Sequence, residues 1–177
     1  GEQHQSAYRA LNPAGLVPAL QDNGATITQS MAILEYLEEL HPEPALLPPS
    51  ALDRARVRAL AQAVACDIHP LNNLRVLNYL TGQLQVSDAQ RTAWMHHWMA
   101  LGLEAIEQQL AHSPQTGQFC HGDTPTLADC CLVPQVFNAQ RFQVDMAPYP
   151  TVQRIAAHCD SLPSFQAAHP ARQADAC

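Results

Sequence analysis

The first forty residues and the rest of the chain differ in their hydrophobic periodicity. A short apolar run at 16–20 ends at the polar stretch QDNG (21–24), and a β-branched run follows at 25–28. Two short runs joined through Asn-Gly predict a β-hairpin, and Pro18 limits how the first run can pair. Ser30 then opens a helix over 31–40, whose expected apolar face comprises Met31, Ile33, Leu34 and Leu37.

Beyond this region the pattern predicts helices only. Residues 41–50 contain four prolines, which indicates a linker. Pairs of polar residues three positions apart resemble capping boxes at three helix starts: Ser50 with Asp53, Ser87 with Gln90, and Thr126 with Asp129. The expected organisation is therefore an α/β region over residues 1–42, a Pro-rich linker over 43–50 and an all-helical domain over 51–177.

Helical spacing also predicts which residues are buried. In the first helix after the linker they are Val57, Leu60, Ala61, Val64 and Ile68, and in the next capped helix Trp94, Trp98, Leu101 and Ala105. Pro134 lies inside the third capped helix and predicts a kink or local unwinding there. Pro150 and Pro163 occupy positions typical of the first turns of two shorter helices.

Composition narrows the class of protein. The chain has 177 residues, 47% hydrophobic and 14% charged, with a net charge of −7 and no lysine. An acidic chain without a basic stripe is a poor candidate for binding nucleic acid or an anionic membrane, and no run is long enough to span a bilayer. Six cysteines without a CxxC pair indicate a reduced, cytoplasmic protein. His96-His97 and Cys120-His121 lack a complete zinc ligand set, so no metal is expected.

Two dipeptides carry the clearest chemical signal. Pro18 is a candidate cis-proline, and Val17 before it would then offer its backbone N–H and C=O to a peptide-like ligand. Gln29 and Ser30 stand at the N-terminus of the 31–40 helix, where free N–H groups favour a carboxylate. Together they indicate a site for a small, anionic, peptide-like molecule. An ordinary strand turn followed by an N-cap serine remains the alternative.

Longer segments resemble a known family. The runs ALNPAGLVPAL (10–20), ITQS (27–30) and ILEYLEE (33–39) are similar to glutathione transferases. CDIHPLNN (66–73), GDTPTLAD (122–129), LVPQ (132–135) and AQRFQVD (139–145) resemble most closely the zeta class, which comprises maleylacetoacetate and maleylpyruvate isomerases. The resemblance implies an incomplete thioredoxin-like N-terminal domain, an all-helical C-terminal domain, glutathione as cofactor and a homodimer.

The resemblance also implies roles for individual residues. Val17 would pair with the cysteinyl backbone of glutathione, with Pro18 in cis, and Gln29 and Ser30 would hold the γ-glutamyl end. The remaining glutathione contacts would come from Gln3, His69 and Asn73. Thr126 and Asp129 match a family element too, but a buried capping pair indicates a structural role.

Arginines are the implied ligands of a small dicarboxylate substrate. Arg141 matches a family arginine that holds a substrate carboxylate. Arg75 stands where the maleylpyruvate enzymes carry Arg and other members carry Ser. Bidentate guanidinium binding suits a dianionic substrate, although Arg75 could equally be a surface arginine with an acidic neighbour.

The implied reaction is cis–trans isomerisation of maleylacetoacetate to fumarylacetoacetate, as in the breakdown of tyrosine. Maleylpyruvate isomerisation in gentisate breakdown, a general glutathione transferase and a non-enzymatic assembly module are the alternatives. The Ser/Cys-rich turn that activates glutathione in the family has no counterpart in residues 1–11. We therefore expect the catalytic turn, with a β-α-β unit, upstream of Gly1, and these 177 residues to be a fragment of a longer protein.

Overall fold

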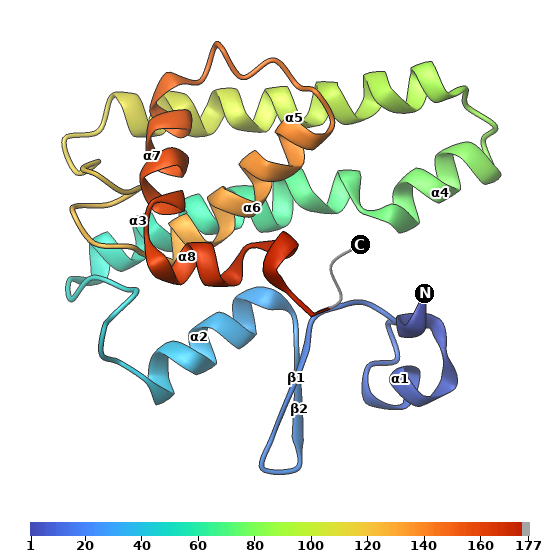
Figure 1. The fold of residues 1–177 in the computed structure, drawn as a ribbon, viewed down its shortest axis with the longest axis horizontal. Helices are drawn as coiled ribbons and strands as arrows, with labels where there is room; N and C mark the ends of the chain where they lie inside the picture. The colour runs from blue at the N-terminus through green and yellow to red at the C-terminus, as the bar shows by residue number, and fades with distance from the viewer. Residues whose placement is uncertain (175–177) are drawn as a thin grey trace. The chain divides into compact units, whose positions relative to one another are not determined.

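A computed structural model describes residues 1–174 of the chain (Figure 1). The chain forms two compact units, Gly1–Leu46 and the part that begins at Leu47. The division falls inside the Pro-rich segment 43–50.

The first unit consists of short elements. They are η1 (Glu2–His4), α1 (Ser6–Leu11), β1 (Ala19–Asp22), β2 (Ala25–Thr28) and α2 (Ser30–Leu40). The strands pair antiparallel, with Leu20 opposite Ile27. Asn23 (φ 47°) and Gly24 (φ 81°) both adopt left-handed conformations, as the two central residues of a type I′ hairpin turn must. The predicted hairpin and the helix opened by Ser30 are therefore confirmed, while α1 was not anticipated.

The second unit is entirely helical, as predicted. Its α-helices are α3 (Ala51–Gln62), α4 (Leu74–Gly82), α5 (Asp88–Ala111), α6 (Leu127–Arg141), α7 (Pro150–Asp160) and α8 (Pro163–Ala168). A π-helical turn, η2 (Ala63–Ile68), and a 3₁₀ turn, η3 (His69–Asn72), separate α3 from α4, and η4 (Pro170–Arg172) follows α8. Figure 1 shows α7 crossing the long α5, and α6 packs against both α3 and α7. No helix among residues 1–174 is long and apolar enough to cross a membrane.

Capping chemistry fixes the helix starts of this unit. The Ser50 hydroxyl accepts from the Asp53 N–H at 3.1 Å, and Ser87 and Gln90 form a reciprocal capping box. Pro150 and Pro163 begin α7 and α8 as predicted. Pro134, in contrast, causes no local unwinding, because α6 is continuous from Leu127 to Arg141.

The core of the second unit confirms one predicted face and corrects another. Val57, Leu60, Ala61, Val64 and Ile68 are all buried, as expected. On α5, however, Leu101 is 56% exposed, and the buried residues are Met95, Met99, Leu103, Ile106, Glu107 and Leu110. The helix has apolar residues on two adjacent sides, and the side that faces α7 and η2 is the buried one. Glu107 is also buried there, and its carboxylate accepts from the Thr151 and Val152 N–H groups at the start of α7 at 3.1 and 2.9 Å.

Candidate functional site

The predicted cis peptide bond is present between Val17 and Pro18. The preceding Leu16 carbonyl accepts two hydrogen bonds, from the Tyr8 hydroxyl and the Asn12 amide, each at 2.7 Å. Val17 itself is 69% exposed, and its backbone groups make no hydrogen bond with the described residues 1–174. The loop is therefore fixed at Leu16 and leaves the next residue open for a strand-like ligand.

Gln29 and Ser30 lie where the chain leaves β2 and enters α2. Gln29 adopts a positive φ of 75° at the N-cap position, and Ser30 is the first helical residue. Both are exposed, and no side chain among residues 1–174 caps this helix start. An uncapped helix N-terminus attracts carboxylates through its N–H groups and its dipole. This end of α2 therefore fits the role expected from the sequence.

Gln3 lies in η1, within the same unit. A Cβ built on Gly15 (φ +61°) would approach the Gln3 carbonyl oxygen to 3.2 Å. Gln3 therefore packs beside the segment that leads into Val17, and Gly15 permits both the left-handed turn and the close approach. The half-buried Gln3 side chain contacts His4 at 3.4 Å.

In the second unit, three candidate residues cluster at the break between α3 and α4. His69 begins η3 and is exposed. Asn73 is the N-cap of α4, and its side-chain oxygen accepts from the Arg75 N–H at 3.1 Å. The cap directs Arg75 into the first exposed turn of α4. The structure thus brings His69, Asn73 and Arg75 together through a change of helix type that the periodicity did not reveal.

Arg75 and Arg141 are alike in that neither guanidinium is paired with a carboxylate among residues 1–174. Arg141 is exposed at the C-terminal end of α6, with its guanidinium 5.8 Å from the centre of the Phe142 ring. Within residues 1–174 neither guanidinium has a carboxylate partner, so the acidic neighbour considered for Arg75 is not found. Arg56, by comparison, donates to the Cys120 carbonyl at 2.7 Å and to the Thr116 hydroxyl at 2.9 Å. Arg75 and Arg141 therefore have guanidiniums available for a ligand.

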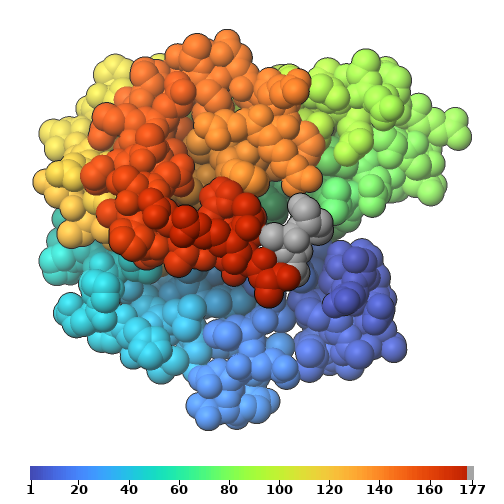
Figure 2. Space-filling model, in the orientation of Figure 1, coloured from blue at the N-terminus to red at the C-terminus, as the bar shows by residue number. Residues whose placement is uncertain are grey.

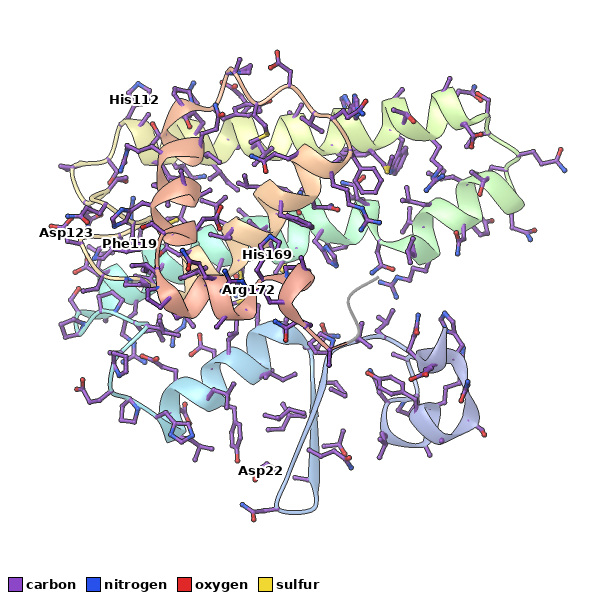
Figure 3. The ribbon with its side chains drawn as sticks, viewed as in Figure 1. Asp22, His112, Phe119, Asp123, His169 and Arg172 are labelled. Carbon is purple, nitrogen blue, oxygen red and sulfur yellow. The ribbon has the colours of Figure 1, made fainter. Side chains whose placement is uncertain are left out.

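Asp129 and Thr126 have a structural role. The Asp129 side chain is fully buried and accepts from the Cys120 N–H at 2.9 Å, the Thr126 N–H at 2.8 Å and the Thr126 hydroxyl at 2.7 Å. It therefore joins the start of α6 to the α5–α6 loop, which Phe119 and Asp123 mark in Figure 3. The side-chain polar atoms of Thr126 and Asp129 are all used in these hydrogen bonds, so neither residue has one available for catalysis.

Three cysteines of the second unit, Cys120, Cys131 and Cys159, have thiols that are not activated as nucleophiles. Burial raises the pKa of Cys131 and of Cys159 to about 12, and burial, followed by the nearby Asp129 carboxylate, raises the pKa of Cys120 well above its ordinary value. A raised pKa keeps a thiol protonated and unreactive at neutral pH. No group of three or more potential metal ligands is found among the described residues.

Comparisons with known proteins identify the family of this chain. Residues 1–45 match the family model for the glutathione S-transferase N-terminal domain, and residues 99–163 match the model for its C-terminal domain. The chain is 48% identical over 177 residues to a probable maleylacetoacetate isomerase of Vibrio cholerae, covering 100% of this chain and 81% of that protein.

Two solved structures are also close. A holo maleylpyruvate isomerase, a bacterial zeta-class glutathione transferase, superposes with a TM-score of 0.97 at 50% identity, covering 99% of this chain and 83% of that chain. A maleylacetoacetate isomerase of Anaeromyxobacter dehalogenans, with dicarboxyethyl glutathione and citrate in its active site, gives a TM-score of 0.85 at 47% identity and covers 98% and 81%. This chain therefore belongs to the glutathione S-transferase family, in the zeta class of maleylacetoacetate and maleylpyruvate isomerases.

Proposed function

We propose that the protein is a glutathione-dependent isomerase that converts maleylacetoacetate to fumarylacetoacetate, in the breakdown of aromatic amino acids. The observation that carries this proposal is the 48% identity to the Vibrio cholerae protein over all 177 residues. The exposed backbone at Val17 and the uncapped start of α2 support it, because both suit an anionic peptide.

In the first unit we assign the peptide backbone of glutathione to Val17. Val17 precedes the cis bond to Pro18 and is 69% exposed, and the two hydrogen bonds on the Leu16 carbonyl fix the loop just before it. Gln29 and Ser30 receive the γ-glutamyl end, whose carboxylate the N-terminus of α2 stabilises. Gln3 lies beside the same segment and adds an amide to the set.

In the second unit we assign glutathione contacts to His69 and Asn73. His69 is exposed at the start of η3, so its ring is accessible to a ligand. Asn73 uses its side-chain oxygen to cap α4, which leaves its amide nitrogen available as a donor. Glutathione, when bound, supplies a thiol that adds reversibly to the conjugated double bond, so that the bond can rotate.

The substrate is assigned to the two arginines. Arg141 holds one carboxylate through a bidentate pair and stabilises negative charge that develops on the substrate during the reaction. Arg75 holds the second carboxylate. The dicarboxyethyl glutathione and citrate bound to the Anaeromyxobacter dehalogenans enzyme support a pocket for small polycarboxylates.

Maleylpyruvate is the second candidate substrate. Arg75, whose guanidinium has no carboxylate partner among residues 1–174, favours it, because this position was the one sequence feature that pointed toward the maleylpyruvate enzymes. The similarity to the holo maleylpyruvate isomerase at a TM-score of 0.97 supports it as well. We further propose that the protein acts in the cytoplasm as a homodimer, since the five cysteines among residues 1–174 are free and its relatives are transferases of this class. Sedimentation velocity tests the dimer.

The deciding experiment compares substrates on the purified full-length protein with glutathione present. We expect turnover of maleylacetoacetate to exceed that of maleylpyruvate, and conjugation of a halogenated carboxylic acid to be much slower than either. Faster turnover of maleylpyruvate would identify the protein as a maleylpyruvate isomerase. Faster conjugation than isomerisation would make the protein a general transferase, and failure to bind glutathione would contradict the proposal.

A further inference from the structure

The break between α3 and α4 contains backbone carbonyls that a continuous helix would have satisfied. The chain passes from α-helix through the π turn Ala63–Ile68 to the 3₁₀ turn His69–Asn72. Each change of helix type moves hydrogen-bond partners out of register, and Pro70 has no N–H to donate. Buried backbone carbonyls need hydrogen-bond donors. The side chains that donate to the carbonyls of this segment therefore help to fix the position of the η3 turn.

Two side chains supply those partners. The Asn72 amide donates to the Ile68 carbonyl at 3.3 Å, within the turn itself. The Trp94 indole N–H donates to the Leu71 carbonyl at 2.8 Å, from α5 and across 23 positions of sequence. Leu71 lies two residues after His69 and two before Asn73. The Trp94 bond therefore acts at the midpoint of the segment assigned to glutathione.

A second contact between α5 and the turn lies at Gly102. A Cβ on Gly102 would fall 2.2 Å from Cγ1 of Ile68, so only glycine lets the π turn approach α5 this closely. Trp94 also packs edge-to-face on Trp98, with ring centres 5.6 Å apart, which fixes the orientation of its indole. The 24-residue α5 thus holds the turn at both η2 and η3.

We infer that Trp94 is a positioning residue for glutathione: its indole N–H holds the η3 turn so that His69 and Asn73 are presented in the binding geometry. The inference rests on the proposed function and deepens it. Trp94 acts through the backbone and needs no contact with the ligand. Ligand-binding groups are effective when neighbouring hydrogen bonds restrict them to the binding geometry.

Trp94→Phe tests this by removing the donor while keeping an aromatic ring. Trp98→Phe is the matched control, since Trp98 is also half-buried on α5 and its indole makes only ring contacts among the described residues. Loss of one neutral hydrogen bond should raise the Kd and KM for glutathione about 3- to 10-fold in Trp94→Phe. The value of kcat at saturating glutathione should change less than about twofold, as expected for an effect on binding alone.

Three outcomes are distinguishable. Equal glutathione affinity of the two variants would overturn the role of Trp94, while absence of glutathione binding in the unmodified protein would overturn the proposed function instead. If Trp94→Phe fails to fold, the fluorescence of Trp94 itself provides a second test. The chain has only two tryptophans, so Trp98→Phe leaves Trp94 as the single indole. In Trp98→Phe the single remaining indole should change its fluorescence when glutathione binds, and a constant spectrum would contradict the inference.

Discussion

The two units position their candidate residues by different physical means. In the first unit only one apolar side chain among the described residues is buried, Ile33 at 9% exposure, whereas Val57, Met99, Leu103 and Ile155 of the second unit have no exposed surface. The hairpin residues appear at the surface in the space-filling view (Figure 2). Within residues 1–174, the candidate residues of the first unit are held by backbone conformation and individual hydrogen bonds, and those of the second unit by packing in its core.

This difference predicts how each region responds to substitution. Around Val17 the geometry comes from the cis bond, the left-handed Gly15 and the two bonds on the Leu16 carbonyl. Around His69 it comes from packing against α5. Core substitutions should therefore affect global stability and, through it, the second set of residues. Substitutions in the first unit should act locally.

The largest effect is expected from Asp129→Ala. It leaves the Cys120 and Thr126 N–H groups buried without an acceptor, and two such losses should destabilise the protein by about 3–5 kcal/mol. Urea denaturation followed by circular dichroism measures the change. Asp123→Ala is the control, because Asp123 is exposed and caps only the Gln118 N–H at 3.0 Å. A loss no larger than that of the control would show that the core does not depend on this network.

Arg141→Ala should lower the catalytic activity and leave the stability of the fold unchanged. Removing a ligand for developing negative charge typically lowers kcat/KM by about 10²-fold, or about 2.7 kcal/mol. Glutathione affinity, measured by calorimetry, should remain unchanged because Arg141 is assigned to the substrate. Arg54→Ala, at an exposed position on α3, controls for loss of positive charge. Equal loss of glutathione binding would contradict the assignment.

Gly102→Ala tests the core contact at the π turn. The added methyl group would overlap Ile68 and force η2 away from α5, at a cost of about 1–3 kcal/mol. Gly82→Ala, with open space around the new methyl group, should instead stabilise α4 by about 0.5–1 kcal/mol. Thermal denaturation of the pair should therefore give shifts of opposite sign. Shifts of the same sign would mean that η2 yields without cost.

Sequence reasoning succeeded where the determinant is local. Asn23-Gly24 specifies its turn, the capping pairs specify helix starts, and Pro18 in cis was anticipated. The sequence-based predictions were wrong where packing between helices decides which residues are buried. On α5 it chose Leu101 over Met99, because both sides of the helix are apolar and only the neighbouring helices select one. The π turn was missed for the same reason, since 57–68 keeps α-helical spacing and the space beside Gly102 is visible only in three dimensions.

The smallest effect is expected in the first unit, from Tyr36→Phe. The Tyr36 hydroxyl donates to Asp22 Oδ2 at 2.5 Å and ties α2 to the end of β1, at the position labelled in Figure 3. Both residues are half-buried and lie outside the core, so loss of the bond should change global stability less than Gly102→Ala does. Hydrogen exchange of the β1 and β2 amides should accelerate, while the amides of α5 keep their protection.

The pH dependence of the difference in exchange rate between wild type and Tyr36→Phe tests whether the Tyr36–Asp22 hydrogen bond causes it. The hydrogen bond to Asp22, followed by desolvation and the Asp22 charge, raises the pKa of Tyr36 above its ordinary value of 10.0. A raised pKa in the folded state favours folding while the phenol is protonated, so the contribution is complete below pH 10.0 and is lost as pH rises through the folded pKa. The exchange rates of wild type and Tyr36→Phe should therefore differ at pH 8 and converge above the folded pKa. A difference that persists there would assign the effect to ring packing rather than to the Tyr36–Asp22 bond.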